Sequence, residues 1–365
     1  MLPDKIGFIG LGLIGGAIAK TIHRVHPDIS LIAYDIDTAS LSQAVQDGVL
    51  THSYDTISDD FASCRYIFLC APVQKNAEFL AKLSNFAGNS CIITDVGSVK
   101  TAIHQEIAGT PVEPYFIGGH PMCGSEKSGY INATPYLLEN AYYILTPTSK
   151  TSPTLLAEFQ TFVQSLGAIP MVMDYQVHDY ATAAISHLPH ILAFTLVNLV
   201  KKLDNPEETM KTIAAGGFRD MTRIASSSPI MWQQICLTNQ TQILNLLDSF
   251  IEALENIRQE IKTENSSCLL DFFQSAKDYR DSLSLNSSGP LSKTFEIYCD
   301  LIDETGGIAT LATILAKNHI SIKNIGIIHN REFQDGVLHI EFYEENALQK
   351  ALVLLRDYHY TVYER

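Results

Sequence analysis

The sequence is poor in positive charge, and its cysteines lack a metal-binding spacing. Twenty-five Lys and Arg residues against 40 Asp and Glu residues give a formal net charge of −15. A field of this sign repels phosphate backbones, so no nucleic-acid partner is expected, and an anionic substrate would need local Arg or Lys. The seven cysteines include no CxxC pair and are odd in number. This disfavours zinc sites and disulfide frameworks, and no metal is expected.

Long apolar runs are also absent. The longest, residues 191–200, is interrupted by Thr195 and Asn198, and it is too short to span a bilayer, so no membrane association is expected. The first residues lead into a strand-like run without a basic or apolar leader, which predicts a cytoplasmic protein with reduced thiols. Hydrophobic residues make up 46% of the 365 residues and charged residues 18%, which is typical of a globular protein with more than one domain.

Hydrophobic patterning divides the chain into three structured regions and a linker. Residues 1–174 alternate β-rich runs with amphipathic stretches, which predicts an α/β fold of the Rossmann type, a doubly wound parallel sheet covered on both faces. Residues 175–283 show only helical patterns, notably at 178–202 and 229–262. Residues 284–294 are rich in Ser, Gly and Pro and are interpreted as a linker. The strands expected in the first region are 6–9, 30–34, 66–70, 91–95, 115–119, 142–146 and 169–173.

The helical and C-terminal regions lead to two further predictions. The segment 229–262 has an apolar face with little else in the sequence to cover it, so an all-α dimerisation domain and a homodimer are expected. In residues 295–365 the order is strand, helix, strand, strand, helix, strand, which is the ferredoxin-like βαββαβ arrangement. These elements are expected at 295–302, 307–318, 320–328, 336–342, 344–356 and 359–363.

A glycine-rich loop follows the first strand and matches G-x-G-x-x-G. Such glycines permit a tight turn, close approach to a pyrophosphate and close helix packing, and the helix N-terminus attracts the phosphates. Asp35 ends the next strand, where a carboxylate accepts hydrogen bonds from an adenosine ribose and repels a 2′-phosphate, which favours NAD over NADP. Asp37 is the alternative if that strand ends later. The expected cofactor-binding residues are Gly10, Leu11, Gly12, Leu13, Ile14, Gly15, Asp35, Ala71 and Pro72.

His120 is the candidate catalytic residue. It is expected on a short rigid loop after the strand at 115–119, facing the cofactor crevice. A neutral imidazole is suited to accept the proton of a hydroxyl whose carbon loses a hydride. Ser98 lies where it would hydrogen-bond His120 and the nicotinamide carboxamide; the alternative is that Ser98 only caps the following helix.

A second cluster lies in the helical region. His187 and His190 are three residues apart and share a helical face if Pro189 is accommodated, and no third metal ligand accompanies them. Arg219 and Arg223, at i and i+4, project together and suit a carboxylate. Asp220, the preceding Gly216 and Gly217, and the single tryptophan, Trp232, complete the cluster.

These motifs together resemble the prephenate dehydrogenase family. The shared segments, in order, are GLGLIGG, DVGSVK, GGHPMCGSEKSG, SHLPH, GGFRDMTRIA and PIMW. The C-terminal segments DETGGIATLATIL and NHISIKNIGI resemble an ACT regulatory domain. The resemblance covers almost the whole chain and implies NAD-dependent oxidative decarboxylation of prephenate to 4-hydroxyphenylpyruvate, a step toward tyrosine.

The resemblance also implies roles for individual residues. His120 would accept the ring-hydroxyl proton, and Ser98 would orient His120. Arg223 would hold a substrate carboxylate, and Glu126 would sit at the mouth of the pocket. The full set implied to contact substrate is Glu126, His190, Gly217, Arg219, Asp220, Arg223 and Trp232. Tyrosine is the implied effector of the ACT domain, near Gly306, Gly307 and Asn324.

The sequence departs from the family pattern at two positions and leaves other functions open. Arg219 stands where many members carry Lys, and Thr305 replaces the usual Pro of the ACT loop. Arogenate dehydrogenase is the nearest alternative, with Glu126 expected to tune the choice. A β-hydroxyacid dehydrogenase is disfavoured because no glycine-flanked Lys helix is present. A non-catalytic regulator that senses nucleotides and amino acids is disfavoured by the joint presence of His120, Ser98, His190 and Arg223.

Overall fold

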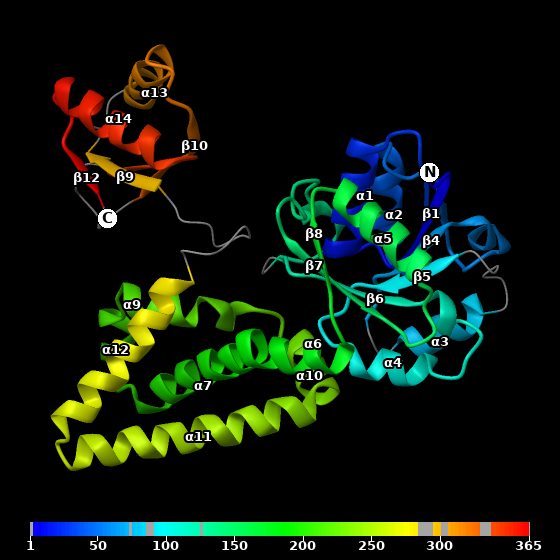
Figure 1. The fold of residues 1–365 in the computed structure, drawn as a ribbon, viewed down its shortest axis with the longest axis horizontal. Coiled ribbons are helices and arrows are strands. Elements are labelled where there is room, and N and C mark those ends of the chain that lie inside the picture. Colours follow the sequence, from blue (N-terminus) through cyan, green and yellow to red (C-terminus); the bar gives the residue numbers. More distant parts are fainter. Residues whose placement is uncertain are drawn as a thin grey trace. The chain divides into compact units, whose positions relative to one another are not determined.

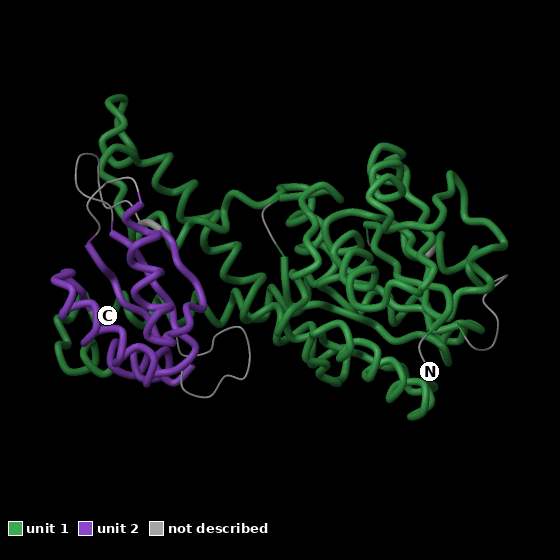
Figure 2. Tube along the Cα trace, turned by 90° about the horizontal axis from the view of Figure 1, so that it is seen from above, with its two compact units in different colours: residues 1–271 green, residues 272–365 purple. Residues whose placement is uncertain are grey.

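The computed structural model describes residues 3–72, 75–84, 91–124, 127–283, 295–300, 306–328 and 337–364. The chain forms two compact units, residues 1–271 and 272–365 (Figure 2). The division falls within the last helix of the helical region, and each unit is described separately below. The predicted domain limits at 174/175 and in the linker 284–294 stay predictions, and that linker lies outside the described residues.

The first unit begins with a five-stranded parallel sheet of order β3-β2-β1-β4-β5. Its strands β1, β4 and β5 are labelled in Figure 1. This is the doubly wound topology predicted from the sequence, with the change of direction between β1 and β4. The sequence patterns located four of these strands, whereas β3 is only three residues long and is largely exposed. The strands are β1 (Lys5–Ile9), β2 (Ser30–Tyr34), β3 (His52–Tyr54), β4 (Tyr66–Leu69) and β5 (Ile92–Asp95).

Helices cover both faces of this sheet because its central strands are apolar on both sides. In β4, which is buried throughout, Tyr66 and Phe68 join one hydrophobic core, and Ile67 and Leu69 join the other. Helices α1, α2 and α5 contribute to the first core, and α3 and α4 contribute to the second. The helices are α1 (Leu13–Val25), α2 (Thr38–Gln46), α3 (Asn76–Leu83), α4 (Thr101–Ile107) and α5 (Pro153–Ser165).

A second, three-stranded sheet corrects the expectation of parallel strands throughout this region. It contains β6 (Ile117–Pro121), β7 (Tyr142–Pro147) and β8 (Ile169–Val172). Strands β6 and β7 are antiparallel, whereas β7 and β8 are parallel and are connected by α5. The described part of the connection between β6 and β7 holds only a short 3₁₀ turn. Without a crossover helix the chain returns in the antiparallel direction.

The helical region begins with one continuous run of 29 residues (Figure 1). It contains α6 (Tyr175–Thr182), a π-helical turn η5 (Ala183–His187) and α7 (Leu188–Leu203). The second predicted segment, 229–262, is helical except for a break at Asn239. The remaining helices are α8 (Thr209–Ile213), α9 (Gly216–Thr222), the 3₁₀ turn η6 (Arg223–Ser226), α10 (Pro229–Thr238), α11 (Gln240–Lys262) and α12 (Ser266–Ser282).

Much of the apolar surface of this region is exposed. The helical run 175–203 is long and apolar enough to cross a membrane by length and composition. The apolar run at 191–200 that the sequence analysis considered is only part of this helix, which also includes polar positions such as His187. Length and composition are weak evidence for a membrane span, because a helix that packs against a partner passes the same test. Exposed apolar side chains continue on the other helices, at Met221, Leu237 and Ile261.

The second unit contains a four-stranded antiparallel sheet of order β10-β11-β9-β12. Its element order is βαββαβ, so the predicted ferredoxin-like, ACT-like fold is confirmed. Leu311 and Leu315 of α13 and Leu352 and Leu355 of α14 are buried in its core. The elements are β9 (Phe295–Asp300), α13 (Gly307–Lys317), β10 (Ile322–Ile328), β11 (Val337–Phe342), α14 (Glu345–Asp357) and β12 (Val362–Glu364).

Candidate active site

The glycine-rich loop joins β1 to α1 at the carboxyl edge of the parallel sheet. Gly10 has a φ of +98°, and a Cβ at this residue would lie 2.6 Å from the backbone nitrogen of Ala71. A Cβ on Gly15 would lie 2.7 Å from the carbonyl oxygen of Gly10. No heavy atom lies within 4 Å of the corresponding position at Gly12. Gly10 and Gly15 therefore permit the turn and the close packing of α1, and Gly12 leaves open space at the N-terminus of that helix.

Asp35 lies beside this loop, just beyond β2. Its Oδ2 accepts a hydrogen bond from the backbone nitrogen of Leu11 at 2.5 Å, and its Oδ1 accepts one from Asp37 at 2.8 Å. The alternative residue, Asp37, caps α2 by accepting hydrogen bonds from Ala39 and Ser40. The hydrogen bonds from Ser40 lower the pKa of the Asp37 carboxyl group. The geometry thus favours Asp35 as the carboxylate of the glycine loop.

The loop residues fit a dinucleotide. The N-terminus of α1 has no side-chain cap, because its N-cap residue is Gly12, so backbone N–H groups remain for an anion. Ala71 and Pro72 follow β4 at the same sheet edge, and Ala71 lies against Gly10. Their contacts with cofactor, and those of Leu11, Leu13 and Ile14, stay predictions.

His120 lies within β6, not on a loop after it as the sequence predicted. The strand extends past the apolar run to Pro121 because it pairs with β7, with His120 opposite Ile144. The Nδ1 atom of His120 lies 2.8 Å from Nε2 of His178 on α6. Burial holds the pKa of His120 well below its ordinary value, and the neighbouring His178, Lys100 and His187 act in the same direction. His120 is therefore a neutral imidazole at neutral pH.

A buried ion pair anchors the segment that carries His120. Lys100 and Asp95 form a salt bridge with both side chains essentially inaccessible to solvent. Asp95 also accepts hydrogen bonds from the backbone nitrogens of Gly119, at 3.1 Å, and Gly97, at 3.0 Å. Burial lowers the pKa of Lys100, and the charge of Asp95 opposes this. Asp95 thus fixes the residues that immediately precede His120 and Ser98.

Ser98 lies half-buried between β5 and α4. Its predicted hydrogen bond to His120 stays a prediction, because the recorded partner of Nδ1 in His120 is His178. The alternative role as a helix cap is wrong, since α4 begins three residues later with Lys100 at its N-cap position. The amides at that helix start are instead bound by Asp179.

The second predicted cluster comes together around Trp232. The ring of His190 stacks on Trp232 with centroids 3.8 Å apart, and His187 contacts the same ring edge-on at 6.0 Å. Pro189 is accommodated because the π-helical turn ends just before it and α7 begins there. The His190 Nδ1 donates to the carbonyl of Ser186 at 2.9 Å, which leaves its Nε2 available as an acceptor. Burial lowers the pKa of His190, and the charge of Arg223 contributes.

The two candidate arginines do not share one α-helix. Helix α9 ends at Thr222, and Arg223 begins the 3₁₀ turn η6, ahead of the serine-rich segment that precedes Pro229. Arg219 and Asp220 are exposed on α9, which packs with η6 against α7. Of the two arginines, it is Arg223 whose charge lowers the pKa of His190. The substrate roles of Arg219, Asp220 and Gly217 stay predictions, and Glu126 lies outside the described residues.

Sequence reasoning missed His178 and Asp179. Nδ1 of His178 donates to Oδ1 of Asp179 at 2.8 Å, and both side chains are buried. The signal in the sequence was an adjacent His-Asp pair in the apolar helical segment that also carries SHLPH. Lys100 was overlooked as well, although it ends the DVGSVK motif.

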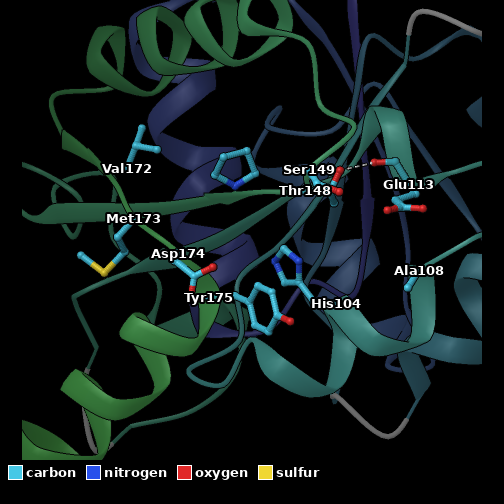
Figure 3. Close-up of a pocket in the computed structure, with 10 residues that line it drawn as sticks. His104, Ala108, Glu113, Thr148, Ser149, Val172, Met173, Asp174 and Tyr175 are labelled. Carbon is cyan, nitrogen blue, oxygen red and sulfur yellow. Dashed lines mark hydrogen bonds between the residues drawn. The ribbon is translucent and has the colours of Figure 1, made fainter.

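A cavity of about 630 Å³ lies elsewhere in the first unit, where β7 and β8 end (Figure 3). In it the rings of His104 and Tyr175 stack with centroids 4.4 Å apart, and Glu113 and Asp174 supply carboxylates. Burial lowers the pKa of His104 to about 4. None of the predicted catalytic, substrate-binding or cofactor-binding residues lines this cavity.

Comparison with known proteins decides the family. The model of the prephenate dehydrogenase nucleotide-binding domain matches residues 18–172, and that of the prephenate dehydrogenase dimerization domain matches residues 174–275. The prephenate dehydrogenase of Bacillus subtilis is 38% identical over 352 residues, which cover 96% of this chain and 95% of the relative. The chain belongs to the prephenate dehydrogenase family. The resemblance seen in the motifs is thereby confirmed, and the protein is an oxidoreductase with a nucleotide-binding domain.

Solved structures agree with this assignment. Prephenate dehydrogenase from Aquifex aeolicus, in complex with hydroxyphenyl propionate and NAD+, matches with a TM-score of 0.74 and 32% identity, covering 78% of this chain and 99% of that one. Arogenate dehydrogenase from Synechocystis matches with a TM-score of 0.69 and 30% identity, covering 76% and 99%. Family membership thus leaves the choice between the two substrates to the chemistry of the site.

Proposed function

We propose that the protein oxidises prephenate with NAD+ and releases carbon dioxide and 4-hydroxyphenylpyruvate. The observation that carries the proposal is the neutral, half-buried His120, anchored through Gly119 to Asp95 at the carboxyl edge of the parallel sheet. The glycine loop leaves the same edge, at the end of β1. This arrangement suits a base that faces a substrate bound against a nicotinamide.

The reaction requires that the substrate is held against the nicotinamide and that one group accepts a proton. Bound NAD+ would supply the hydride acceptor. His120 takes the hydroxyl proton of the carbon that loses hydride, and the electron pair of the bond to the leaving carboxylate moves into the ring. The ring becomes aromatic, carbon dioxide leaves, and the phenolate oxygen regains a proton. Because aromatisation drives the reaction, no separate acid is required.

The substrate carries two carboxylates, and the protein carries a net charge of −15. Local cations must therefore reverse the field at the site. Arg223, whose charge acts on His190, is proposed to bind one carboxylate, and His190 and Trp232 are proposed to contact the rest of the substrate. Arg219, Asp220, Gly217 and Glu126 are proposed to complete the pocket.

NAD is proposed in preference to NADP. The carboxylate oxygens of Asp35 accept hydrogen bonds from the backbone amides of Leu11, in the glycine loop, and Asp37, and each oxygen retains capacity for a ribose hydroxyl. A 2′-phosphate at that place would meet a negative charge.

The proposed function is tested by the absorbance of NADH at saturating NAD+ with prephenate or arogenate in parallel. A higher kcat/KM on prephenate is expected. A higher value on arogenate would instead favour the alternative, which the similarity to the Synechocystis enzyme keeps open. Absence of NADH with both compounds would contradict both.

A homodimer is proposed to cover the exposed apolar side chains of the helical region. The matched dimerization domain spans 174–275, and within it Ile185, Met221 and Leu237 are each at least 68% exposed. Surfaces of this kind mark protein interfaces. Light scattering after size exclusion is expected to give twice the mass of the 40.4 kDa chain; a monomer at micromolar concentration would contradict the proposal. A cytoplasmic location is proposed, because the seven scattered cysteines are free thiols in the structure.

Tyrosine is proposed as an inhibitor that binds the ACT-like unit. Gly306 has a φ of +95° and is the N-cap residue of α13, and Gly307 begins that helix. Asn324, on β10, donates a hydrogen bond from Nδ2 to Glu341 at 3.3 Å. Thr305 lies outside the described residues. Addition of tyrosine is expected to lower NADH production, and an unchanged rate would contradict regulation by this amino acid.

A further inference from the structure

We propose that His178 is a positioning residue that keeps the proton of His120 on Nδ1, so that Nε2 of His120 is the base presented to the substrate. The inference deepens the proposed function and rests on it. It follows from a chain of hydrogen bonds that runs from Asp179 through His178 to His120.

The direction is set at Asp179. An ionised carboxylate only accepts hydrogen bonds, so the 2.8 Å contact between Oδ1 of Asp179 and Nδ1 of His178 requires a proton on that nitrogen. Burial raises the pKa of Asp179, but the hydrogen bonds from His178 and Thr101 outweigh it, and the pKa is lowered overall. Asp179 is therefore ionised at neutral pH.

The tautomer of His120 follows from that of His178. We assign the single ring proton of His178 to Nδ1, which leaves a lone pair at Nε2. The 2.8 Å contact between this atom and Nδ1 of His120 then requires His120 to donate. The two rings meet edge-on, with an interplanar angle of 76°. Since His120 is neutral, its other nitrogen, Nε2, has the free lone pair that a general base needs.

His178 is itself held rigidly. Oδ1 of Asp179 accepts the backbone N–H of Lys100, and Oδ2 accepts that of Thr101, each at 2.7 Å. These are the first amides of α4, so a carboxylate on α6 caps a helix of the nucleotide-binding region. The carbonyl of His178 accepts the hydroxyl of Thr182 at 2.9 Å. The acceptor offered to His120 therefore has a fixed place, and the same clamp joins α6 to the segment that carries Ser98.

Two substitutions separate this role from packing alone. H178Q retains an oxygen able to accept from His120 and an amide able to donate to Asp179, whereas H178F keeps the volume and removes the acceptor. In H178F the imidazole of His120 populates both tautomers and rotates, so kcat is expected to fall about 10- to 100-fold, part of the contribution of a general base. The KM for NAD+ and prephenate is expected to change by less than about threefold, because neither is bound by His178.

The experiment compares kcat and KM of the wild-type protein, H178Q and H178F, and measures the ¹⁵N chemical shifts of the His120 ring nitrogens in the wild type. H178Q is expected to stay within about fivefold of wild-type kcat, and the shifts are expected to give a protonated Nδ1 and an unprotonated Nε2. Wild-type kcat in H178F, an equal loss in both variants, or a proton on Nε2 of His120 would overturn the inference. The chemical shifts are measured on the wild-type protein without turnover, so they test the assigned tautomer of His120 even if H178F does not fold. Wild-type protein that makes no NADH would contradict the proposed function instead.

Discussion

The carboxylate of Asp95 accepts the backbone N–H of Gly119 at 3.1 Å while its other oxygen pairs with the buried ammonium group of Lys100. Through this bond the last residue of β5 fixes the residue before His120. There is no room for a side chain at this contact, because a Cβ on Gly119 would lie 2.5 Å from the carbonyl oxygen of Asp95. The position of the catalytic candidate therefore depends on an ion pair whose side chains are inaccessible to solvent.

Lys100→Met is expected to destabilise the protein by about 3–5 kcal/mol, because it leaves the charge of Asp95 buried and unpaired. Urea unfolding followed by the fluorescence of Trp232, the single tryptophan, measures the change. The matched control is Lys211→Met. In its salt bridge with Glu208 the two side chains are 70% and 60% exposed, and a loss below about 1 kcal/mol is expected. Equal losses of unfolding free energy in the two variants would show that burial of the Lys100–Asp95 pair does not increase the cost of breaking it.

Gly12→Ala is expected to weaken cofactor binding, whereas Gly15→Ala is expected to lower the stability of the fold. Space is open at Gly12, so a methyl group there leaves stability unchanged and obstructs the phosphates of the cofactor. At Gly15 a methyl group would lie 2.7 Å from the carbonyl oxygen of Gly10, which displaces α1 and lowers the melting temperature. Titration with NADH and thermal melts distinguish the two. Tight NADH binding by Gly12→Ala would contradict the predicted phosphate site.

Asp35→Ser is expected to reduce the preference for NAD over NADP by about tenfold or more, because it removes the charge that repels a 2′-phosphate. The ratio of kcat/KM for the two cofactors is the measurement. Asp37→Ser is the control, since Asp37 caps α2 and serine is a comparable N-cap residue, so neither the stability nor the ratio is expected to change. A changed ratio in the control alone would assign the ribose contact to Asp37.

Acid is expected to destabilise the protein through His104. In the folded state its pKa is lowered from 6.5 to about 4, chiefly by burial, so the unfolded chain binds the proton more readily. The contribution of neutral His104 is complete above about pH 6.5 and is lost as the pH falls toward 4. His104→Gln, which preserves a partner for Thr146, is expected to flatten the dependence of unfolding free energy on pH by up to about 1.4 kcal/mol per unit. An unchanged slope from pH 4.5 to 6.5 would contradict this.

The parts of the site that are local in sequence were predictable. The glycines, the helix behind them and Asp35 lie within 26 residues, and their spacing alone indicates the turn, the helix start and the strand end. The ferredoxin-like order of the second unit was likewise readable, because each of its elements has a clear hydrophobic period.

Contacts between distant segments were not predictable. His120 and His178 are 58 positions apart, and nothing in the local pattern of either residue indicates the other. The antiparallel pairing of β6 and β7 also escaped prediction, since an apolar strand carries no sign of its direction. Asp179 caps α4 from another helix. A search for a cap among the residues just before α4 could not find Asp179 and led to Ser98 instead.

The central claim is that His120 accepts the substrate proton beside a bound nicotinamide. The most direct test is the rate of NADH formation from NAD+ and prephenate by the wild-type protein and His120→Asn, with NADH binding measured in both. The claim predicts that kcat falls by about 10²- to 10⁴-fold while NADH binds as in the wild type. Turnover at the wild-type rate by His120→Asn would contradict it.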